Sequence, residues 1–374
     1  MSRPRILYIL SSLAANDLGD EIITILGRLS RSEFEPRVIA LGGKEELMGR
    51  LVEMKVRCYP LGLAGALGTY RAVAKTKALL RKLDPAVVHG YGSWGGSVAQ
   101  LASPPNVHVV RTVTQPPNHE SDLRGRVLQY LERRGRTKPG TRFIVPNEES
   151  RGLATRAYGA QEQHVVVLPR SVDVGDVRDR VARTGRDEAR TLMGVGGDDL
   201  AVVLLSGFES GARMDQILTG FAMALEEEPR LRLFVVGSGR YEGSTRWKAE
   251  ELRLGDSVVF LGRGTETGPI WSAADAAIDA SPWASWSRAA LIAIAAGVPT
   301  VKRQEGVGGW SEELDESLPM ISGTPERFAA ELVRLAREPA VRDAIRAQGG
   351  DVAREVDSAS VAERLGGLYA YLTR

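Results

Sequence analysis

The stretch AAIDASPWASWSRAALIAIAAGVPTV, residues 276–301, decides the fold. It begins with a short apolar strand over 276–280, passes through a turn rich in Ser and Trp, and enters a helix that runs to Gly297, followed by a strand over 300–303. Ser287 is expected to cap the helix, because its side chain can accept a hydrogen bond from a free amide of the first turn. Free amides and the helix dipole attract anions, so the turn from Ser285 to Arg288 is a candidate phosphate site.

Strand and helix patterns alternate on both sides of this stretch. The run 6–10 is continuously apolar, as expected of a strand buried on both faces of a parallel sheet, and similar runs recur at 38–41, 86–89, 200–205 and 231–236. Alternation at this spacing predicts βαβ units and parallel sheets. The charged, Gly-containing segment 171–199 interrupts the alternation, and we interpret it as an interdomain connection.

Composition sets further bounds. The chain has 374 residues, 43% hydrophobic and 26% charged, which fits about two soluble globular domains. A net charge of +2, from 49 basic and 47 acidic residues, gives no footprint for nucleic acid. The single cysteine, Cys58, fits a reducing compartment, and no window approaches the ~18 apolar residues of a membrane span, so we expect a cytoplasmic protein.

Residues 276–301 resemble the donor-site motif of retaining glycosyltransferases of the family-four type (glycosyl transferases group 1). That motif reads Ser-x-x-Glu-Gly-Phe-Gly, four residues, then Glu-Ala-Met-Ala-x-Gly-x-Pro. Aligned on Gly297 and Pro299, the framework residues Ser281, Ala293 and Ala295 match it, and Leu291 is also a framework residue. The segments LDPAVVHGYG (83–92) and VVFLGRGTE (258–266) resemble further strands and turns of the family.

The resemblance implies an α/β fold of GT-B architecture, with two Rossmann-like domains whose parallel sheets face each other across a cleft. We expect an acceptor-side domain over 1–170, the connection over 171–199, a donor nucleotide-sugar domain over 200–350, and a C-terminal helix in 351–374 that crosses back to the first domain. The implied activity is metal-independent, retaining transfer of a sugar from a nucleotide-sugar to a hydroxyl acceptor, in glycan or polysaccharide assembly. The nucleotide-sugar is then a substrate, and no cofactor is implied.

Six positions at which the family carries donor-site residues are changed here: Leu18, Thr114, Phe208, Ala212, Ala284 and Ile292. The last two replace the family's two glutamates, and neither replacement accepts a hydrogen bond from a hydroxyl. We therefore assign no catalytic residue. The alternative hypothesis is a catalytically inactive relative that acts as a binding module or as the partner of an active glycosyltransferase. A dinucleotide-dependent enzyme is a weaker third interpretation, because the complete GxGxxG fingerprint is missing.

The remaining candidates would bind the donor nucleotide. Arg213 and Arg288 could replace the lost phosphate-binding cations, since a guanidinium binds phosphate in a bidentate manner. Each could equally be solvated, and Gly19 could be only a helix-entry glycine. Arg263 and Gly264 match positions that touch the base through the main chain. The full candidate set is Gly19, Arg213, Gly237, Gly239, Arg263, Gly264, Ser285, Trp286, Ser287 and Arg288.

Two further site classes are not expected. The four histidines are scattered and no HExxH or Asp-x-Asp pair occurs, which gives no metal site. The basic segment 123–138 has an apolar side, and we expect it to pack that side on the sheet and to solvate its charges rather than to bind a membrane.

Overall fold

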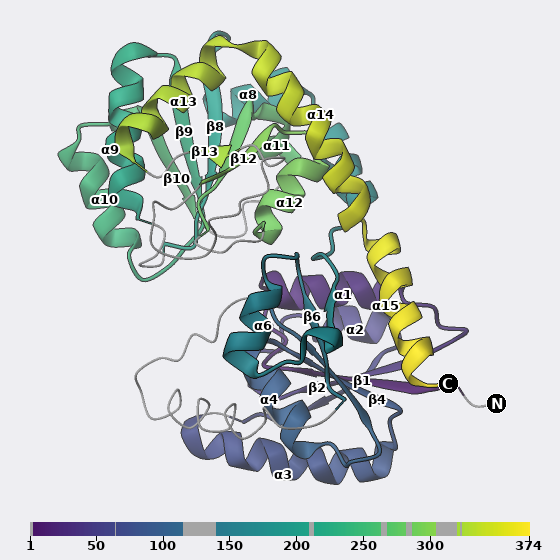
Figure 1. Ribbon diagram of the computed structural model, residues 1–374. Coiled ribbons are helices and arrows are strands. Elements are labelled where there is room, and N and C mark those ends of the chain that lie inside the picture. Colours follow the sequence, from purple (N-terminus) through teal and green to yellow (C-terminus); the bar gives the residue numbers. More distant parts are fainter. Residues whose placement is uncertain are drawn as a thin grey trace. The chain divides into compact units, whose positions relative to one another are not determined.

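The computed structural model describes residues 3–63, 65–114, 140–208, 213–262, 268–281, 286–303, 320–321 and 324–374. The chain divides into two compact units, each a central sheet with helices on both faces (Figure 1). Unit 1 comprises Met1–Ser171 together with Ser358–Arg374, and unit 2 is Val172–Asp357. The chain therefore leaves unit 1 once and returns to it once.

Unit 1 is built on a seven-stranded sheet in the order β3-β2-β1-β4-β5-β6-β7, in which the paired strands are parallel. β1 is the buried apolar run predicted near the N-terminus, and its alternate side chains enter two different cores. The strands are β1 (Arg5–Leu10), β2 (Glu35–Ala40), β3 (Arg57–Pro60), β4 (Val87–Tyr91), β5 (His108–Thr112), β6 (Arg142–Val145) and β7 (Val165–Val167).

Helices cover both faces of this sheet. One core joins the sheet to α1, α2 and α15, and the other joins it to α3 and α4. The helices are α1 (Asp17–Arg28), α2 (Met48–Glu53), α3 (Gly65–Leu83), α4 (Gly92–Ala102), α6 (Arg151–Tyr158), the short 3-10 helix η1 (Glu162–His164) and α15 (Ser358–Leu372). The terminal helix thus completes the unit formed by the beginning of the chain.

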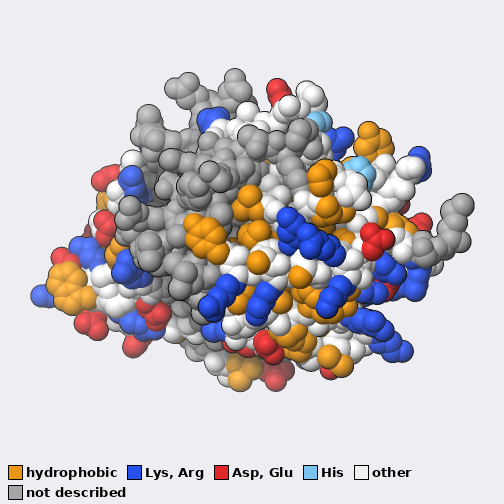
Figure 2. Space-filling model, turned by 90° about the horizontal axis from the view of Figure 1, so that it is seen from below, with side chains coloured by type: hydrophobic (Ala, Val, Ile, Leu, Met, Phe, Trp, Pro, Cys, Tyr) orange, Lys and Arg blue, Asp and Glu red, His pale blue; other side chains and the backbone are white. Residues whose placement is uncertain are grey.

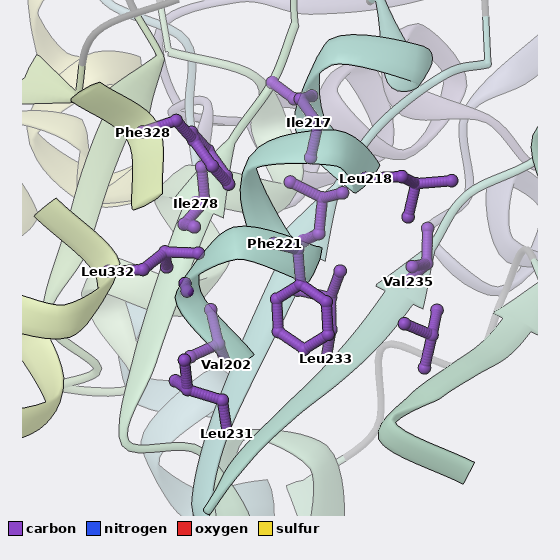
Figure 3. Packing of buried hydrophobic residues seen from close by; sticks show 14 of the residues in the cluster. Val202, Ile217, Leu218, Phe221, Leu231, Leu233, Val235, Ile278, Phe328 and Leu332 are labelled. Carbon is purple, nitrogen blue, oxygen red and sulfur yellow. The ribbon is translucent and has the colours of Figure 1, made fainter. Parts of the chain in front are cut away.

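Unit 2 has a six-stranded parallel sheet in the order β10-β9-β8-β11-β12-β13. Side chains of α9 and α13 meet over β8 and β9, where Phe221 lies beside Leu233 (Figure 3). The second face is covered by α7, α11 and α12. The strands are β8 (Leu200–Leu205), β9 (Leu231–Val236), β10 (Val258–Gly262), β11 (Ala276–Asp279), β12 (Thr300–Arg303) and β13 (Met320–Ile321), and the helices are α7 (Val174–Ala182), α8 (Arg186–Met193), α9 (Met214–Glu227), α10 (Glu242–Glu251), η3 (Gly255–Ser257), α11 (Gly268–Ala273), α12 (Arg288–Ala295), α13 (Pro325–Arg337) and α14 (Pro339–Val356).

Two predicted boundaries differ from the structure. Residues 172–199 are part of unit 2 rather than a separate connection, because Val174, Val177 and Ala189 are buried in it. The boundary expected at residue 350 lies inside α14, which continues through Gly349 and ends at Val356. The break falls instead at Asp357, whose side chain accepts a hydrogen bond from the Val174 amide at 3.3 Å. Residue 358, not residue 351, therefore begins the return to unit 1.

Helix α3 carries a one-sided charge pattern. Its apolar side enters the core of unit 1, whereas its exposed side bears five cations, and its sequence contains no Asp or Glu. The exposed cations are Arg71, Lys75, Lys77, Arg81 and Lys82. Seen from below, several Lys and Arg side chains lie in the central and right-hand part of the view, with hydrophobic side chains between them (Figure 2). In the described part of the chain, no helix is both long and apolar enough to cross a bilayer.

A buried polar network ties α15 to the sheet of unit 1. Tyr369 donates to the hydroxyl of Tyr8 at 2.9 Å, and its oxygen lies 2.6 Å from Nδ1 of His89. Nε2 of His89 lies 2.7 Å from the hydroxyl of Thr112. A neutral imidazole that donates from Nδ1 and accepts at Nε2 satisfies this arrangement. Burial lowers the pKa of His89 from 6.5 to about 3, because the charged form would be desolvated.

This buried histidine should make unit 1 sensitive to acid. Unfolded chains protonate His89 below pH 6.5 whereas the folded unit stays neutral down to about pH 3, so stability is lost as the pH falls through that window. His89→Gln should reduce the loss between pH 7 and pH 4.5 by about 2–3 kcal/mol, measured by urea unfolding at each pH. The matched control is His108→Gln at an exposed position. Equal acid sensitivity in the two variants would contradict the assignment.

Candidate functional site

The strand order of unit 2 locates a binding edge. The first strand of this sheet along the chain is β8. Strands β9 and β10 follow on one side of it, and β11, β12 and β13 lie on the other side, so the strand order reverses between β8 and β11. In open parallel sheets, ligands bind outside the carboxyl ends of the strands at this reversal. Here those ends lead into Ser206–Phe208 and, after β11, into Ala280 and Ser281. Trp286 and Ser287 precede α12, and residues 282–285 lie outside the described residues. The four described residues between β11 and α12 are called the β11–α12 turn below.

A buried ion pair holds the β11–α12 turn. Asp279 and Lys302 are partners in the register of β11 and β12, and they are 0% and 5% exposed. Nζ of Lys302 lies 3.0 Å from Oδ2 of Asp279 and 2.9 Å from Oγ of Ser281. The Asp279 carboxylate in turn accepts the amides of Ser281 at 3.0 Å and Ser287 at 2.8 Å. One carboxylate therefore fixes residues at both ends of the turn.

Helix α12 begins as the sequence predicts. Ser287 is its N-cap, and its hydroxyl accepts a hydrogen bond from the Ala290 amide at 3.1 Å, which confirms the predicted cap. Trp286 precedes the cap and packs partly against the core beneath α12, with its ring 5.9 Å from Nζ of Lys302. The cation lies against an aromatic face, which is a favourable contact.

Arg288 and Arg213 occupy different environments. Arg288 is the first residue of α12 and is half-buried, and within the described part of the chain its Nε is buried without a hydrogen-bond partner. A cation at a helix N-terminus is unfavourable by itself, so a bound anion would stabilise it. Arg213 precedes α9 in a left-handed conformation with φ of 44°, and it is exposed. Of the two predicted cations, Arg288 is the one beside the β11–α12 turn.

The predicted glycines of unit 2 permit close approach of the backbone. A Cβ on Gly237, whose φ is +147°, would lie 1.6 Å from the carbonyl oxygen of Ser206. A Cβ on Gly239 would lie 2.1 Å from the carbonyl oxygen of Gly207. Both glycines therefore pack the loop after β9 directly onto the loop after β8. A ligand role for them stays a prediction.

Two of the substituted positions are buried in unit 2. Phe208 is 1% exposed, and its ring stacks on that of Phe260 at 6.2 Å. Ile292 is 6% exposed in the core beneath α12. The side chains that stand where the resembled motif has an arginine and a glutamate thus contribute to packing and offer no hydrogen bond.

Unit 1 has a corresponding reversal of strand order between β1 and β4. Gly19 is the third residue of α1, and its amide donates to Oδ1 of the N-cap residue Asn16 at 3.0 Å. A Cβ on Gly19 would lie 2.3 Å from the carbonyl oxygen of Ala14. Leu18 and Gly19 line a small hollow together with Ser11 and Tyr91. This environment fits the helix-entry interpretation of Gly19.

In unit 1, Glu21 and Arg170 form a buried ion pair. They are 3% and 7% exposed, and Nε of Arg170 donates to the carboxylate at 2.9 Å. The pair lines a hollow together with Thr114, the residue at a position where the resembled family has a histidine.

Several predicted residues lie outside the described residues. These are Arg263, Gly264 and Ser285, the substituted positions Ala212 and Ala284, and the basic segment 123–138. In the parts of the chain that are described, no three His, Cys, Asp or Glu side chains gather as they would around a metal ion.

Sequence reasoning missed Asp279 and Lys302. Asp279 ends the otherwise apolar strand AAID, and Lys302 lies in the neighbouring strand TVKR, where burial of a lone charge would be costly. A carboxylate at the end of one predicted strand and an ammonium at the matching place in the next could have been paired from the sequence, since adjacent parallel strands align such positions.

Family profiles match most of both units. The family profile for Glycosyltransferase Family 4 matches residues 22–176, and the profile for Glycosyl transferases group 1 matches residues 201–338. An alpha-monoglucosyldiacylglycerol synthase of Streptococcus pneumoniae is 25% identical over 244 residues, which cover 62% of this chain and 55% of that protein. A D-inositol 3-phosphate glycosyltransferase of Actinosynnema mirum is 27% identical over 280 residues, 69% of this chain and 66% of that protein. The chain thus matches between about half and two thirds of these relatives' lengths.

Solved structures show the same fold. Anabaena Alr3699/HepE in complex with UDP superposes with a TM-score of 0.76 at 16% identity, covering 98% of this chain and 100% of that one. WaaG, a glycosyltransferase involved in lipopolysaccharide biosynthesis, superposes with a TM-score of 0.69 at 15% identity, covering 97% and 99%. The two parallel-sheet units therefore have the GT-B fold that the sequence predicts.

Proposed function

We propose that this chain, which belongs to the group 1 glycosyltransferases, binds a nucleotide-sugar at the carboxyl edge of the unit 2 sheet and transfers its sugar to a hydroxyl acceptor. The observation that carries the proposal is the β11–α12 turn at the reversal of strand order, held by Asp279 and followed by a capped helix N-terminus. UDP in the complex of the structural neighbour Alr3699/HepE supports a nucleotide as the ligand class.

Arg288 is the residue through which we expect this site to bind the diphosphate. Its Nε is available for an acceptor, and the neighbouring amides of α12 lie at the positive end of the helix dipole. A transferase without a metal must stabilise the departing diphosphate with such groups. Contacts of this kind would replace the phosphate-binding cations that the resembled family has at positions 208 and 212. They would not replace the two glutamates, which in that family lie beside the donor sugar and the ribose.

The first test is calorimetric titration with UDP, GDP, ADP and UDP-glucose. We expect one of them to bind with a Kd below about 100 µM, which is about −5.5 kcal/mol. Arg288→Ala should weaken that binding by about 10- to 100-fold, because one charge-assisted phosphate contact contributes about 1.5–3 kcal/mol. Arg183→Ala, at an exposed position of unit 2, is the matched control. Equal nucleotide affinities of the two variants would show that Arg288 does not contribute to nucleotide binding.

A second candidate function is a non-catalytic glycosyltransferase relative that pairs with an active enzyme. The burial of Phe208 and Ile292 favours it, since these positions cannot contact a donor. Absence of heat with all four nucleotides, together with co-purification with another glycosyltransferase, would support this candidate. Hydrolysis of a nucleotide-sugar that is slowed by Arg288→Ala would support transfer.

A further inference from the structure

We propose that Lys302 and Asp279 are positioning residues that hold Ser281, after β11, and Ser287, before α12, in place for ligand binding. The inference rests on the proposed function, because it concerns the same edge of unit 2. It adds two residues for which the donor-site resemblance provides no role, and it assigns them a task that a merely structural ion pair would not have.

The location of the pair is hard to explain by stability alone. Both side chains are buried in the adjacent strands β11 and β12, and taking two charges out of water offsets most of their attraction. An apolar pair of similar volume would stabilise the sheet about as well. A reason to keep the charges must therefore lie in what else they contact.

Their remaining contacts run to the turn. Lys302 reaches both the hydroxyl and, at 3.4 Å, the carbonyl oxygen of Ser281, and Asp279 accepts the amides of Ser281 and Ser287. Ser287 is also the N-cap of α12, so the carboxylate fixes the entry of the helix that carries Arg288. Loss of the pair would free both ends of the turn and add an ordering cost to every binding event.

A partly buried ion pair at the other end of β11, between Arg190 and Asp275, provides a comparison. Arg190 contacts Asp275 at 3.1 Å, and it also donates to the carbonyl oxygens of Gly196 and Asp199. Asp275 accepts the Ala201 amide at 2.8 Å. This pair holds the amino ends of the strands and makes no recorded contact with the β11–α12 turn among the described residues. Loss of the Arg190–Asp275 pair should therefore destabilise unit 2 without releasing Ser281 or Ser287.

The test compares Asp279→Leu/Lys302→Met with Arg190→Met. Hydrogen exchange of the full chain without ligand should be at least tenfold faster at the amides of Ser281 and Ser287 in the double variant, and unchanged there in Arg190→Met. The Kd for UDP should rise about tenfold or more in the double variant only. Should the double variant fail to fold, Asp279→Asn/Lys302→Met keeps the volume at position 279 and leaves no buried charge unpaired. Its amide offers one acceptor oxygen where the carboxylate offers two, so exchange should be faster at one of the two amides and the Kd for UDP should still rise.

Two outcomes would overturn the inference. The first is wild-type exchange at Ser281 and Ser287 in a folded double variant, and the second is an unchanged Kd for UDP. A wild-type protein that binds no nucleotide would instead contradict the proposed function, and the exchange comparison would then still decide whether the pair fixes the turn.

Discussion

A chain that ends at Asp357 should lose the folded structure of unit 1 and keep that of unit 2. The missing helix α15 supplies Val361, Leu365, Tyr369 and Leu372 to the core on one face of the unit 1 sheet, and none of the four is more than 8% exposed. Burial of each such side chain contributes about 1.5–3 kcal/mol. Their sum, about 6–12 kcal/mol, is comparable with the whole stability of a domain.

Hydrogen exchange resolved by peptide would check this result, since strands of unit 1 should exchange freely while β8 and β9 stay protected. Tyr371→Ser, at a position of α15 that is 65% exposed, should leave both units protected and serves as the control. Retained protection of β1 and β4 in the shortened chain would show that α15 is dispensable. Leu365→Ala gives an intermediate case, with an expected loss of about 2–5 kcal/mol.

Substitution Gly237→Ala should destabilise unit 2 by about 3–5 kcal/mol or more. The added methyl group would overlap the Ser206 carbonyl oxygen, 1.6 Å away, and a φ of +147° is strained for any residue with a Cβ. Because both contacting groups are backbone, neither can move without displacing β8 or β9. We expect the transition of unit 2 in thermal unfolding to shift downward while that of unit 1 is unchanged.

Gly243→Ala is the matched control for this substitution. Gly243 lies in α10 with nothing within 4 Å of its added Cβ, so the same chemical change should stabilise the protein by about 0.5–1 kcal/mol. Stability changes of opposite sign for two glycines six residues apart would show that position 237 requires glycine because the backbone of the neighbouring loop lies so close to it. Destabilisation below about 1 kcal/mol by Gly237→Ala would contradict the close approach.

Local patterns in the sequence predict much of the fold. The apolar runs at 200–205 and 231–236 are β8 and β9, because a continuous apolar run is a local signal for a buried strand. Boundaries that depend on tertiary contacts were less predictable. The domain boundary expected at residue 350 falls on a pair of glycines, Gly349 and Gly350, but α14 continues through both, and Gly349 lies close to Ile294.

The candidate site divides in the same way. Ser287 was predictable as a cap because the signal lies within four residues, whereas the bond from its amide to Asp279 joins residues eight apart through the turn. The pairing of Asp279 with Lys302 needs the strand register as well. Nor does a sequence show that the side chain replacing a polar residue is buried, as Phe208 and Ile292 are.

Unit 1 is formed by two segments that are far apart in the sequence, and this affects how the protein folds during synthesis. A ribosome delivers residues in order, and domains usually fold as they emerge. Here residues 358–374 follow the whole of unit 2, so the sheet of unit 1 must wait, with the surface that α15 covers still exposed, until unit 2 has been synthesised. The later part of the chain can therefore reach its native state first, and the apolar surface of the waiting sheet is where nascent chains would engage a chaperone.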